Sequence, residues 1–367
     1  MTSSTTPTAY AVSPDSGEHW TAEGAWPVAE GVHRIPLPLP MDGLKAINVY
    51  VIEVDDGLVL IDGGWSIPVA RELLDTSLRS IGSGFGDIKR FLVTHVHRDH
   101  YTLARVLGRE LAVDVALGRG EQPAMDALND LEGLAENPFS SLLRGAGADD
   151  IAEQWNEGRA DQDRPDPAWW EYPDSWLDGD HRIDLGPRTL DAVETPGHTP
   201  GHFVFADQPA GLMFTGDHVL PTITPSIGFT FPATPQPLGE FMASLAKVRS
   251  LPDLRVLPAH GPVAPSTHTR VDELLVFHEK RLDLCLAALA RADGPLSSAQ
   301  VGAELPWTRH ATAYDDLDIF SRGMAAMETK AHLELLVARE LATRDEHADG
   351  LVLFRAVSGT PSPPGTS

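Results

Sequence analysis

The stretch THVHRDHY, residues 94–101, decides the fold of this 367-residue chain. It places three histidines and an aspartate within six residues and follows the apolar run FLV, which predicts a buried strand. Alternate side chains of an extended segment share a face, so His95 and His97 can point one way. The turn that follows can direct Asp99 and His100 toward a second point. Zinc and iron both accept imidazole and carboxylate ligands, so the stretch predicts a metal site at a strand end.

Three further candidate ligands follow apolar strands in the same manner. The segment ETPGHTPGH, residues 194–202, presents His198 after a tight Pro-Gly turn. Asp217 ends the apolar run GLMFTGD, and His260 follows the run RVLPA and precedes a glycine. Polar residues at the ends of successive strands gather at one edge of a sheet, so we expect these residues to join the first cluster.

The segments around these motifs alternate between strands and helices. INVYVIEV and GLVLIDGG are β-branched runs on either side of a turn at Asp55-Asp56-Gly57, and residues 67–82 have helical spacing. After residue 180 the strands resume, with one further helix at about 236–250. This alternation predicts an α/β layered domain over residues 21–265. Residues 119–180 are acidic and rich in tryptophan, and we expect a mostly helical insertion that covers the site.

The composition changes after residue 265. An amphipathic helix is predicted over 270–292, a second begins at Ser297 or Ser298, and a third spans about 320–342. A hairpin that turns near Asp349-Gly350 follows. We interpret residues 266–357 as a winged-helix-like helical domain. The Ser-, Thr- and Pro-rich ends, residues 1–20 and 358–367, are expected to be disordered tails.

The ordered set His-x-His-x-Asp-His, then His, Asp and His, is similar to the pattern of the metallo-β-lactamase superfamily. The segments Thr-His and Pro-Gly-His-Thr-Pro-Gly-His resemble its glyoxalase II–like branch, and the resemblance covers about residues 25–265. It implies an α/β fold, an αββα sandwich with metals at one edge of two sheets. The tail resembles the winged-helix extension of some β-lactamase-like hydrolases, including a branch of endoribonucleases.

The resemblance also implies the roles of the candidate ligands. His95, His97 and His198 would hold one zinc ion, Asp99, His100 and His260 a second, and Asp217 would bridge the two. Asp62 in LIDGG would orient the ligand loop without binding a metal. A hydroxide held by the zinc ions would attack the acyl carbonyl of a small-molecule thioester, lactone or other ester, and Asp99 would also pass a proton to the leaving group.

The remaining polar residues receive more ordinary interpretations. His202 is expected to pack near the site without binding metal, His218 to point away from it, and Tyr101 either to face the substrate or to pack. Cys285 is expected to be a small buried side chain, since a single cysteine excludes an intramolecular disulfide. Six histidines are expected to be structural: His33, His181, His268, His310, His332 and His347.

Two other functions stay open. Persulfide dioxygenases resemble the chain at the first three histidines but use one iron, and the filled second ligand set favours hydrolysis over that chemistry. An endoribonuclease would need a basic recognition helix, whereas the third C-terminal helix mixes arginine and lysine with glutamate. We therefore expect the C-terminal helices to complete the substrate cleft or a dimer interface.

The composition of the chain argues against some classes of binding partner. The formal net charge of −25 repels phosphate backbones, which argues against a general nucleic-acid binder. No apolar run approaches the roughly 18 residues of a membrane span, and the first residues lack the pattern of a signal peptide. We expect a cytoplasmic enzyme without membrane contact. Aromatic and proline residues in 119–180 and 219–237 favour an apolar or aromatic acyl substrate.

Overall fold

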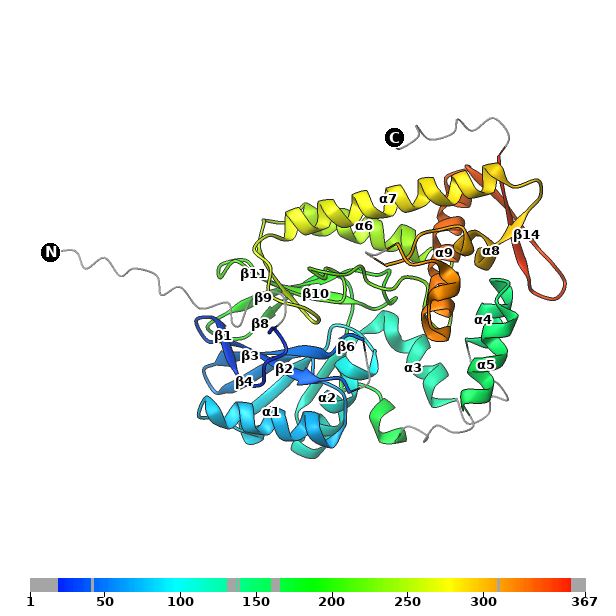
Figure 1. Cartoon of the computed structure of the whole chain (residues 1–367). Helices are drawn as coiled ribbons and strands as arrows, with labels where there is room; N and C mark the ends of the chain where they lie inside the picture. Colours follow the sequence, from blue (N-terminus) through cyan, green and yellow to red (C-terminus); the bar gives the residue numbers. More distant parts are fainter. Residues whose placement is uncertain are drawn as a thin grey trace.

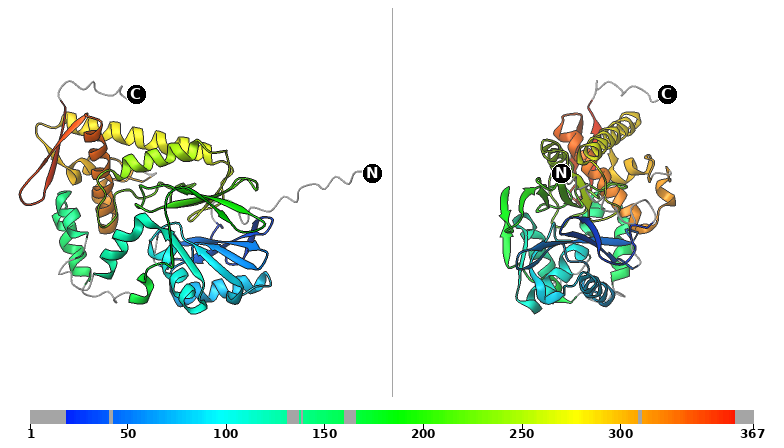
Figure 2. Two further views of the ribbon diagram at one scale, coloured as in Figure 1. Left: turned by 180° about the vertical axis from the view of Figure 1, so that it is seen from behind. Right: turned by 90° about the vertical axis from the view of Figure 1, so that its left-hand side faces the viewer.

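Two facing sheets with helices on their outer faces form the body of the chain (Figure 1). The computed structural model describes residues 19–40, 43–130, 137, 139–159, 166–308 and 311–357. The first sheet has the order β1-β2-β3-β4-β5-β6-β7 and the second β12-β11-β10-β9-β8. The expected αββα sandwich is confirmed, with α1 and α2 on one side and α6 and α7 on the other (Figure 2).

The first sheet changes direction at its centre. Its antiparallel part comprises β1 (Trp26–Ala29), β2 (Val32–Pro38), β3 (Ala46–Val54) and β4 (Gly57–Ile61). Its parallel part adds β5 (Ile88–Leu92), β6 (Asp114–Gly118) and β7 (Ser175–Leu177). The helices α1 (Pro68–Ser80) and α2 (Arg98–Leu111) make the first two of these parallel connections, because parallel neighbours need a crossover.

Strand β3 shows why its sequence suits a sheet between two layers. Ile47, Val49 and Val51 pack with the helices α1 and α2, whereas Tyr50 and Ile52 pack against the second sheet. Successive side chains of a strand point to opposite faces, so an uninterrupted apolar run is buried on both sides. The result is one apolar layer beneath the helices and another between the sheets.

The second sheet is mostly antiparallel. It contains β8 (His181–Asp184), β9 (Thr189–Glu194), β10 (Phe203–Asp207) and β11 (Leu212–Gly216), and β12 (Arg255–Pro258) joins β11 in parallel. The helix α6 (Pro237–Arg249) makes that crossover and packs on the outer face with α7 (Thr267–Arg291).

Three helices and a small sheet follow the second sheet. They are α7, α8 (Ser298–Ala303) and α9 (Ile319–Ala338), with β13 (Leu296–Ser297), β14 (Ala342–Glu346) and β15 (Val352–Ala356) in the order β13-β15-β14. Ser297 caps α8 through a capping box with Gln300. The buried residues of this region belong to one apolar cluster with α6 and the second sheet. A domain boundary near residue 265 and a winged-helix arrangement remain predictions.

The connection between β6 and β8 is less uniform than the sequence suggests. It contains α3 (Gln122–Asn129), α4 (Ser140–Gly145) and α5 (Asp149–Arg159), but residues 175–177 form β7 at the edge of the first sheet. A three-residue strand is too short to show a period of two, which explains why the sequence does not predict it. The third C-terminal helix also ends at Ala338 rather than near residue 342.

The two predicted tails lie outside the described residues, apart from residues 19 and 20. Trp20 is buried, and its carbonyl accepts a hydrogen bond of 2.6 Å from the Arg34 guanidinium. Trp20, which the sequence assigns to a disordered tail, is therefore packed. In the described part of the chain, no helix has the length and apolar character needed to cross a membrane.

Candidate metal centre

Four strand ends carry the predicted ligands to one edge of the sandwich. The histidine stretch follows β5, and the other ligand loops follow β9, β11 and β12. Backbone hydrogen bonds join these loops: the amide of Phe203 donates to Thr94 across 2.8 Å, and the amide of Ala259 donates to Gly216 across 3.1 Å. Residues far apart in the sequence therefore meet on a backbone frame that extends both sheets.

The first group of ligands consists of three histidines from both sheets. His95 Nε2 lies 2.9 Å from His97 Nδ1, and His198 Nε2 lies 3.2 Å from that same His97 atom. Burial lowers the pKa of His97 to about 3, with neighbouring His198 adding to the effect, and burial also lowers the pKa of His95 and His198. The three rings are neutral at physiological pH, which is the form that binds metals.

The second group combines histidines with acidic residues. Asp99 Oδ2 lies 3.4 Å from His260 Nε2 and 3.7 Å from His100 Nε2. Burial acts to lower the pKa of His100, but the carboxylates of Asp62, Asp99 and Asp217 outweigh it and raise this pKa to about 10. The pKa of His260 is raised for the same kind of reason. The surrounding carboxylates thus favour positive charge at this point of the structure.

Asp217 lies between the two groups and offers one oxygen to each. Its Oδ2 is 3.4 Å from His198 Nε2, whereas its Oδ1 is 3.4 Å from His260 Nε2 and 3.7 Å from His100 Nε2. The candidate donor atoms of His95, His97, His198 and Asp217 lie within 4.8 Å of one another, as do those of Asp99, His100 and His260. All seven predicted ligands are therefore brought together, in two adjacent groups.

Unpaired buried atoms show that these residues fit metal ions. His100 Nε2, His260 Nε2 and Asp217 Oδ1 are buried and have no hydrogen-bond partner among the described residues. Buried polar atoms are almost always paired, because an unpaired one loses its water contacts without compensation. Three such atoms converge on one point here. A cation at this point would satisfy all three, which a single protein donor could not do.

Contacts on the far side of each ring hold these histidines in place. His100 Nδ1 donates to Asp62 Oδ2 at 2.9 Å, and the Nδ1 atoms of His198 and His260 lie 2.8 Å from the carbonyl oxygens of Ser226 and Ala46. Each contact favours a proton on Nδ1 and turns Nε2 toward the site. These two carbonyls carry no sequence signal, because any residue can supply one.

Asp62 has a second set of contacts within the ligand stretch. Its Oδ1 accepts hydrogen bonds from the Thr94 amide at 2.8 Å and from the Thr94 hydroxyl at 3.0 Å. The same carboxylate therefore holds both the start of the ligand stretch and the ring of His100. This is the orienting role that the resemblance of the LIDGG segment implies.

Three other singled-out residues lie beside the ligands without joining either group. His202 Nε2 accepts the amide hydrogen of Asp217 at 3.1 Å, and its Nδ1 lies 2.9 Å from the Thr195 hydroxyl. Tyr101 is buried and donates its hydroxyl hydrogen to the carbonyl of Glu171, so it packs rather than facing substrate. His218 is buried against Phe241.

The remaining histidines and the cysteine lie elsewhere. His33, His181, His268, His332 and His347 belong to neither ligand group, and His310 lies outside the described residues. Cys285 is buried in α7, and burial raises the pKa of its thiol to about 12. A thiol in that state is inert at neutral pH.

Glu121 is a site residue that no sequence pattern singles out. Its buried carboxyl accepts a hydrogen bond from the Thr199 hydroxyl, next to the ligand His198. Burial raises the pKa of Glu121 to about 7, although Thr199 and the amides of Gly201 and Val96 act to lower it. A lone glutamate in the turn after β6 has no distinguishing neighbours in the sequence, so only the fold reveals that it connects two ligand loops.

A cavity of about 780 Å³ opens over both ligand groups. His97, Asp99, His198 and Asp217 are among the residues that line it. As expected, residues from 119–180 and 219–237 contribute to its wall, but Phe320 and Met324 of α9 line it too. Its most apolar wall residues include Val96, Leu128, Phe139, Trp170, Leu220, Ile223, Phe229, Phe231, Phe320 and Met324.

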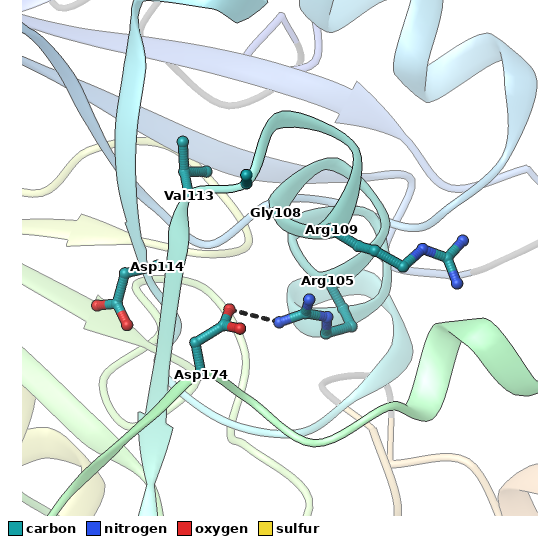
Figure 3. A pocket seen from close by; sticks show the side chains of 7 residues that line it. Arg105, Gly108, Arg109, Val113, Asp114 and Asp174 are labelled. Carbon is teal, nitrogen blue, oxygen red and sulfur yellow. Dashed lines mark hydrogen bonds and ion pairs between the residues drawn. The ribbon is translucent and has the colours of Figure 1, made fainter.

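A second cavity of about 470 Å³ lies beside the C-terminal half of α2 and contacts none of the candidate ligands (Figure 3). Arg105 points into it and pairs with Asp174, with 2.5 Å between Nη1 and Oδ2, while Arg109 pairs with Glu171 at 2.9 Å. These ion pairs fasten the segment before β7 to α2. The cavity therefore lies where ion pairs hold this segment against α2.

Comparisons with known proteins agree with this geometry. The family model described as Metallo-beta-lactamase superfamily matches residues 42–260. A Beta-lactamase-like protein 2 homolog of Caenorhabditis elegans is 23% identical over 279 residues, which are 75% of this chain and 77% of that protein. An atrochrysone carboxyl ACP thioesterase of Aspergillus aculeatus is 31% identical over 199 residues, which are 51% of this chain and only 57% of the fungal protein.

Solved structures extend the likeness beyond the matched family region. A metallo-beta-lactamase family protein of Thermus thermophilus superimposes with a TM-score of 0.72 at 25% identity, covering 90% of this chain and all of that one. A beta-lactamase domain protein of Burkholderia ambifaria gives a TM-score of 0.70 at 24% identity, covering 91% and 95%. With its family region, its fold and its cluster of histidines and aspartates, the chain belongs to the metallo-beta-lactamase superfamily.

Proposed function

We propose that this protein is a two-zinc hydrolase that cleaves the thioester, or a related ester, of a small apolar acyl compound. The observation that carries the proposal is the position of Asp217, which directs one carboxylate oxygen to each of two ligand groups. A carboxylate shared in this way suits two neighbouring cations, whereas one metal would need a single group. The unpaired buried atoms of His100, His260 and Asp217 support one of these two positions.

The seven candidate ligands would divide between two zinc ions as their contacts suggest. His95, His97 and His198 would hold one zinc ion, Asp99, His100 and His260 the other, and Asp217 both. Zinc bound by such ligands lowers the pKa of a coordinated water toward neutrality and polarises a carbonyl oxygen. Histidine and carboxylate donors without any thiolate suit zinc, and they also suit iron, so metal identity belongs to the test.

The protein's own groups would then orient the substrate and move protons. The apolar cavity wall would hold the acyl group and exclude water from the bond to be cleaved. Asp99 lines the cavity beside the ligands, where its carboxylate can pass a proton to the leaving sulfur or oxygen. The far-side partners Asp62, Ser226 and Ala46 would keep the ligand rings aligned throughout.

One observation favours thioesters over other esters, and another disfavours polyanionic substrates. The protein is similar to fungal atrochrysone carboxyl ACP thioesterases, at 31% and 33% identity over parts of their length. The net charge of −25 also disfavours a polyanionic substrate such as RNA. A persulfide dioxygenase would need only the first three histidines, so it leaves the four other ligands unexplained.

The test is metal content combined with a substrate panel. Purified protein would be measured by mass spectrometry for bound metals, and then assayed with thioesters, lactones, a chromogenic β-lactam and a phosphodiester. We expect two zinc ions per chain and thioester turnover that Asp99→Ala abolishes. One iron per chain with oxygen uptake on a persulfide would replace the proposal with dioxygenase chemistry, and turnover of the phosphodiester alone would favour a nuclease.

A further inference from the structure

The residues that line the cavity over the metal centre form two chemically different groups, which we call its polar end and its apolar end. At one end lie the candidate ligands and Glu121, with the polar side chains of Thr199 and Ser226. At the other end, four phenylalanines and a methionine form the wall: Phe139, Phe229, Phe231, Phe320 and Met324. Such division is typical of a site that holds an apolar group while a few polar groups act on one bond.

Aromatic contacts give the apolar end a defined shape. The rings of Phe139 and Phe229 are stacked, with centroids 4.2 Å apart and an angle of 8° between planes. Phe229 also meets Phe320 at 5.9 Å, and Phe320 stacks on Trp155 at 5.5 Å. Because these rings brace one another, the wall has a defined shape, and little side-chain entropy is lost on binding.

The C-terminal helix α9 builds this end directly and indirectly. It contributes Phe320 and Met324 to the wall. It also supports the loop between β11 and α6, since the Gln236 amide donates to the Glu334 carbonyl at 3.2 Å. A side chain at Gly228 would lie 3.1 Å from the Met327 carbonyl, so the loop backbone rests on the helix. The loop that carries Phe229 and Phe231 is therefore shaped by α9.

Charge distinguishes the ligands that this end accepts. Among the described residues that line the cavity, Arg98 is the sole arginine or lysine; it lies next to the candidate ligands and stacks on Trp65 at 4.4 Å. The apolar end, as far as it is described, offers no cation to a carboxylate or phosphate. An anionic group there would lose its water without gaining a partner, whereas an uncharged hydrocarbon would gain from leaving water.

We infer that the end formed by Phe139, Phe229, Phe231, Phe320 and Met324 is an acyl subsite, which selects thioesters with an elongated, uncharged hydrocarbon acyl group. This inference rests on the proposed hydrolase function and specifies its substrate class. It makes α9, which carries no candidate ligand, part of the substrate-binding surface. Alkyl and aryl acyl groups share the chemistry that the subsite recognises.

The test compares thioesters of one thiol that differ only in the acyl group. We expect kcat/KM to rise at least tenfold from acetyl to decanoyl or 4-phenylbutanoyl, and to fall at least tenfold when a carboxylate ends the decanoyl chain. Comparison of kcat/KM for the decanoyl and the 4-phenylbutanoyl thioester shows whether the subsite prefers an alkyl or an aryl group. Equal kcat/KM for acetyl, decanoyl and carboxydecanoyl thioesters would overturn the inference.

Two variants locate the subsite. Met324→Trp should lower the decanoyl-to-acetyl ratio of kcat/KM at least tenfold by filling the apolar end, and Phe320→Ala should shift the preference toward longer acyl groups. Val276→Trp places the same large ring on the exposed face of α7, away from the cavity, and should leave the ratio unchanged. An unchanged ratio in Met324→Trp would contradict the assignment, as would the same loss in Val276→Trp.

Binding separates failure of the subsite from failure of the proposed function. S-ethyl and S-decyl thioethers, which cannot be hydrolysed, would be titrated against the metal-loaded protein by calorimetry. We expect the decyl compound to bind at least tenfold more tightly, and Met324→Trp to remove the difference. If no thioester is turned over, the proposed function fails while this binding still decides the subsite.

Discussion

Charge shapes the metal centre at the level of single residues. The carboxyl of Asp217 is buried, which would raise its pKa, but His260, His100 and His198 outweigh burial and hold that pKa below its usual value. Asp217 is therefore ionised at neutral pH, and each oxygen faces a different set of rings. Its position makes it the one ligand whose loss affects both groups.

Replacing Asp217 by alanine should therefore remove more metal than the loss of one donor suggests. We expect Asp217→Ala to hold at most one zinc ion per chain after dialysis, because both groups lose an oxygen and the remaining histidines become harder to bring together. Mass spectrometry of the folded protein measures the content. Asp56→Ala, in an exposed turn, is the matched control. Two zinc ions retained in Asp217→Ala would disprove a shared ligand.

The raised pKa of Glu121 has a measurable effect on stability. Its carboxyl has a pKa of about 7 in the folded protein against 4.5 as the usual value. The folded state therefore binds more protons than the unfolded state between these values, so the contribution of Glu121 to stability is present at low pH and is lost as pH rises through 7. A neutral glutamine cannot show this loss.

We expect the free energy of unfolding of the metal-free parent to fall relative to that of Glu121→Gln by about 2 kcal/mol between about pH 5 and about pH 8. Urea unfolding at several pH values measures the difference, and the histidines titrate alike in both proteins. The exposed Glu72→Gln variant should run parallel to the parent. Parallel curves for Glu121→Gln would mean that burial does not perturb this carboxyl.

At the level of elements, close backbone crossings place the ligand loops. A side chain at Gly197, beside the ligand His198, would lie 2.4 Å from the backbone of Phe241 in α6. Gly197 also has a φ of +135°, which suits glycine alone. The turn before His198 is thus pressed against the helix, and α6 determines how far the ring reaches into the site.

Gly197→Ala should cost at least about 3 kcal/mol of unfolding free energy, because backbone strain and overpacking add. Gly211→Ala controls for positive φ alone, since Gly211 has a φ of +71° with open space around it, and it should cost about 1 kcal/mol. Chemical denaturation of both variants gives the comparison. Equal losses of unfolding free energy in the two variants would show that α6 moves to make room for the added methyl group. The contact between Gly197 and α6 would then not position His198.

The sequence could predict the ligands but not the whole wall of the cavity. Each ligand follows an apolar strand and lies in a short recognisable motif, so His198, Asp217 and His260 were identifiable one by one. Phe320 and Met324 have the spacing of any helix that packs on a core, and only tertiary contacts bring them over the metal centre. Strand β7 was not predicted because pairing with β6, rather than its own pattern, makes it a strand.

On the scale of the whole molecule, the metal centre connects the two sheets. His95 and His97 follow a strand of the first sheet, and His198, Asp217 and His260 follow strands of the second. Ions bound there would hold the sheets together at one edge. The net charge of −25 adds to this, because it raises the local concentration of cations and leaves acidic groups that repel one another when metals are absent.

Removal of metal should therefore lower the melting temperature of the whole chain. Ligands that bind only the folded state stabilise it by about 4 kcal/mol at 1,000 times their dissociation constant, which corresponds to a shift on the order of 5–10 °C here. Calorimetry with zinc and with a chelator measures the shift. The melting temperature of Asp217→Ala should change less on chelation than that of the parent. An unchanged melting temperature of the parent in chelator would show that the sheets do not depend on bound ions.

The helix α9 binds no metal and lies after the region, residues 42–260, that the family model matches. Mutations at Phe320 or Met324 therefore change no candidate ligand and none of the residues that contact the far side of the ligand rings. The side chains of this helix that line the cavity can therefore change while the candidate ligands stay the same. Descendants of one ancestral enzyme can then diverge in the compounds they consume while the catalytic centre stays unchanged, and a shared family region will say little about what each of them consumes.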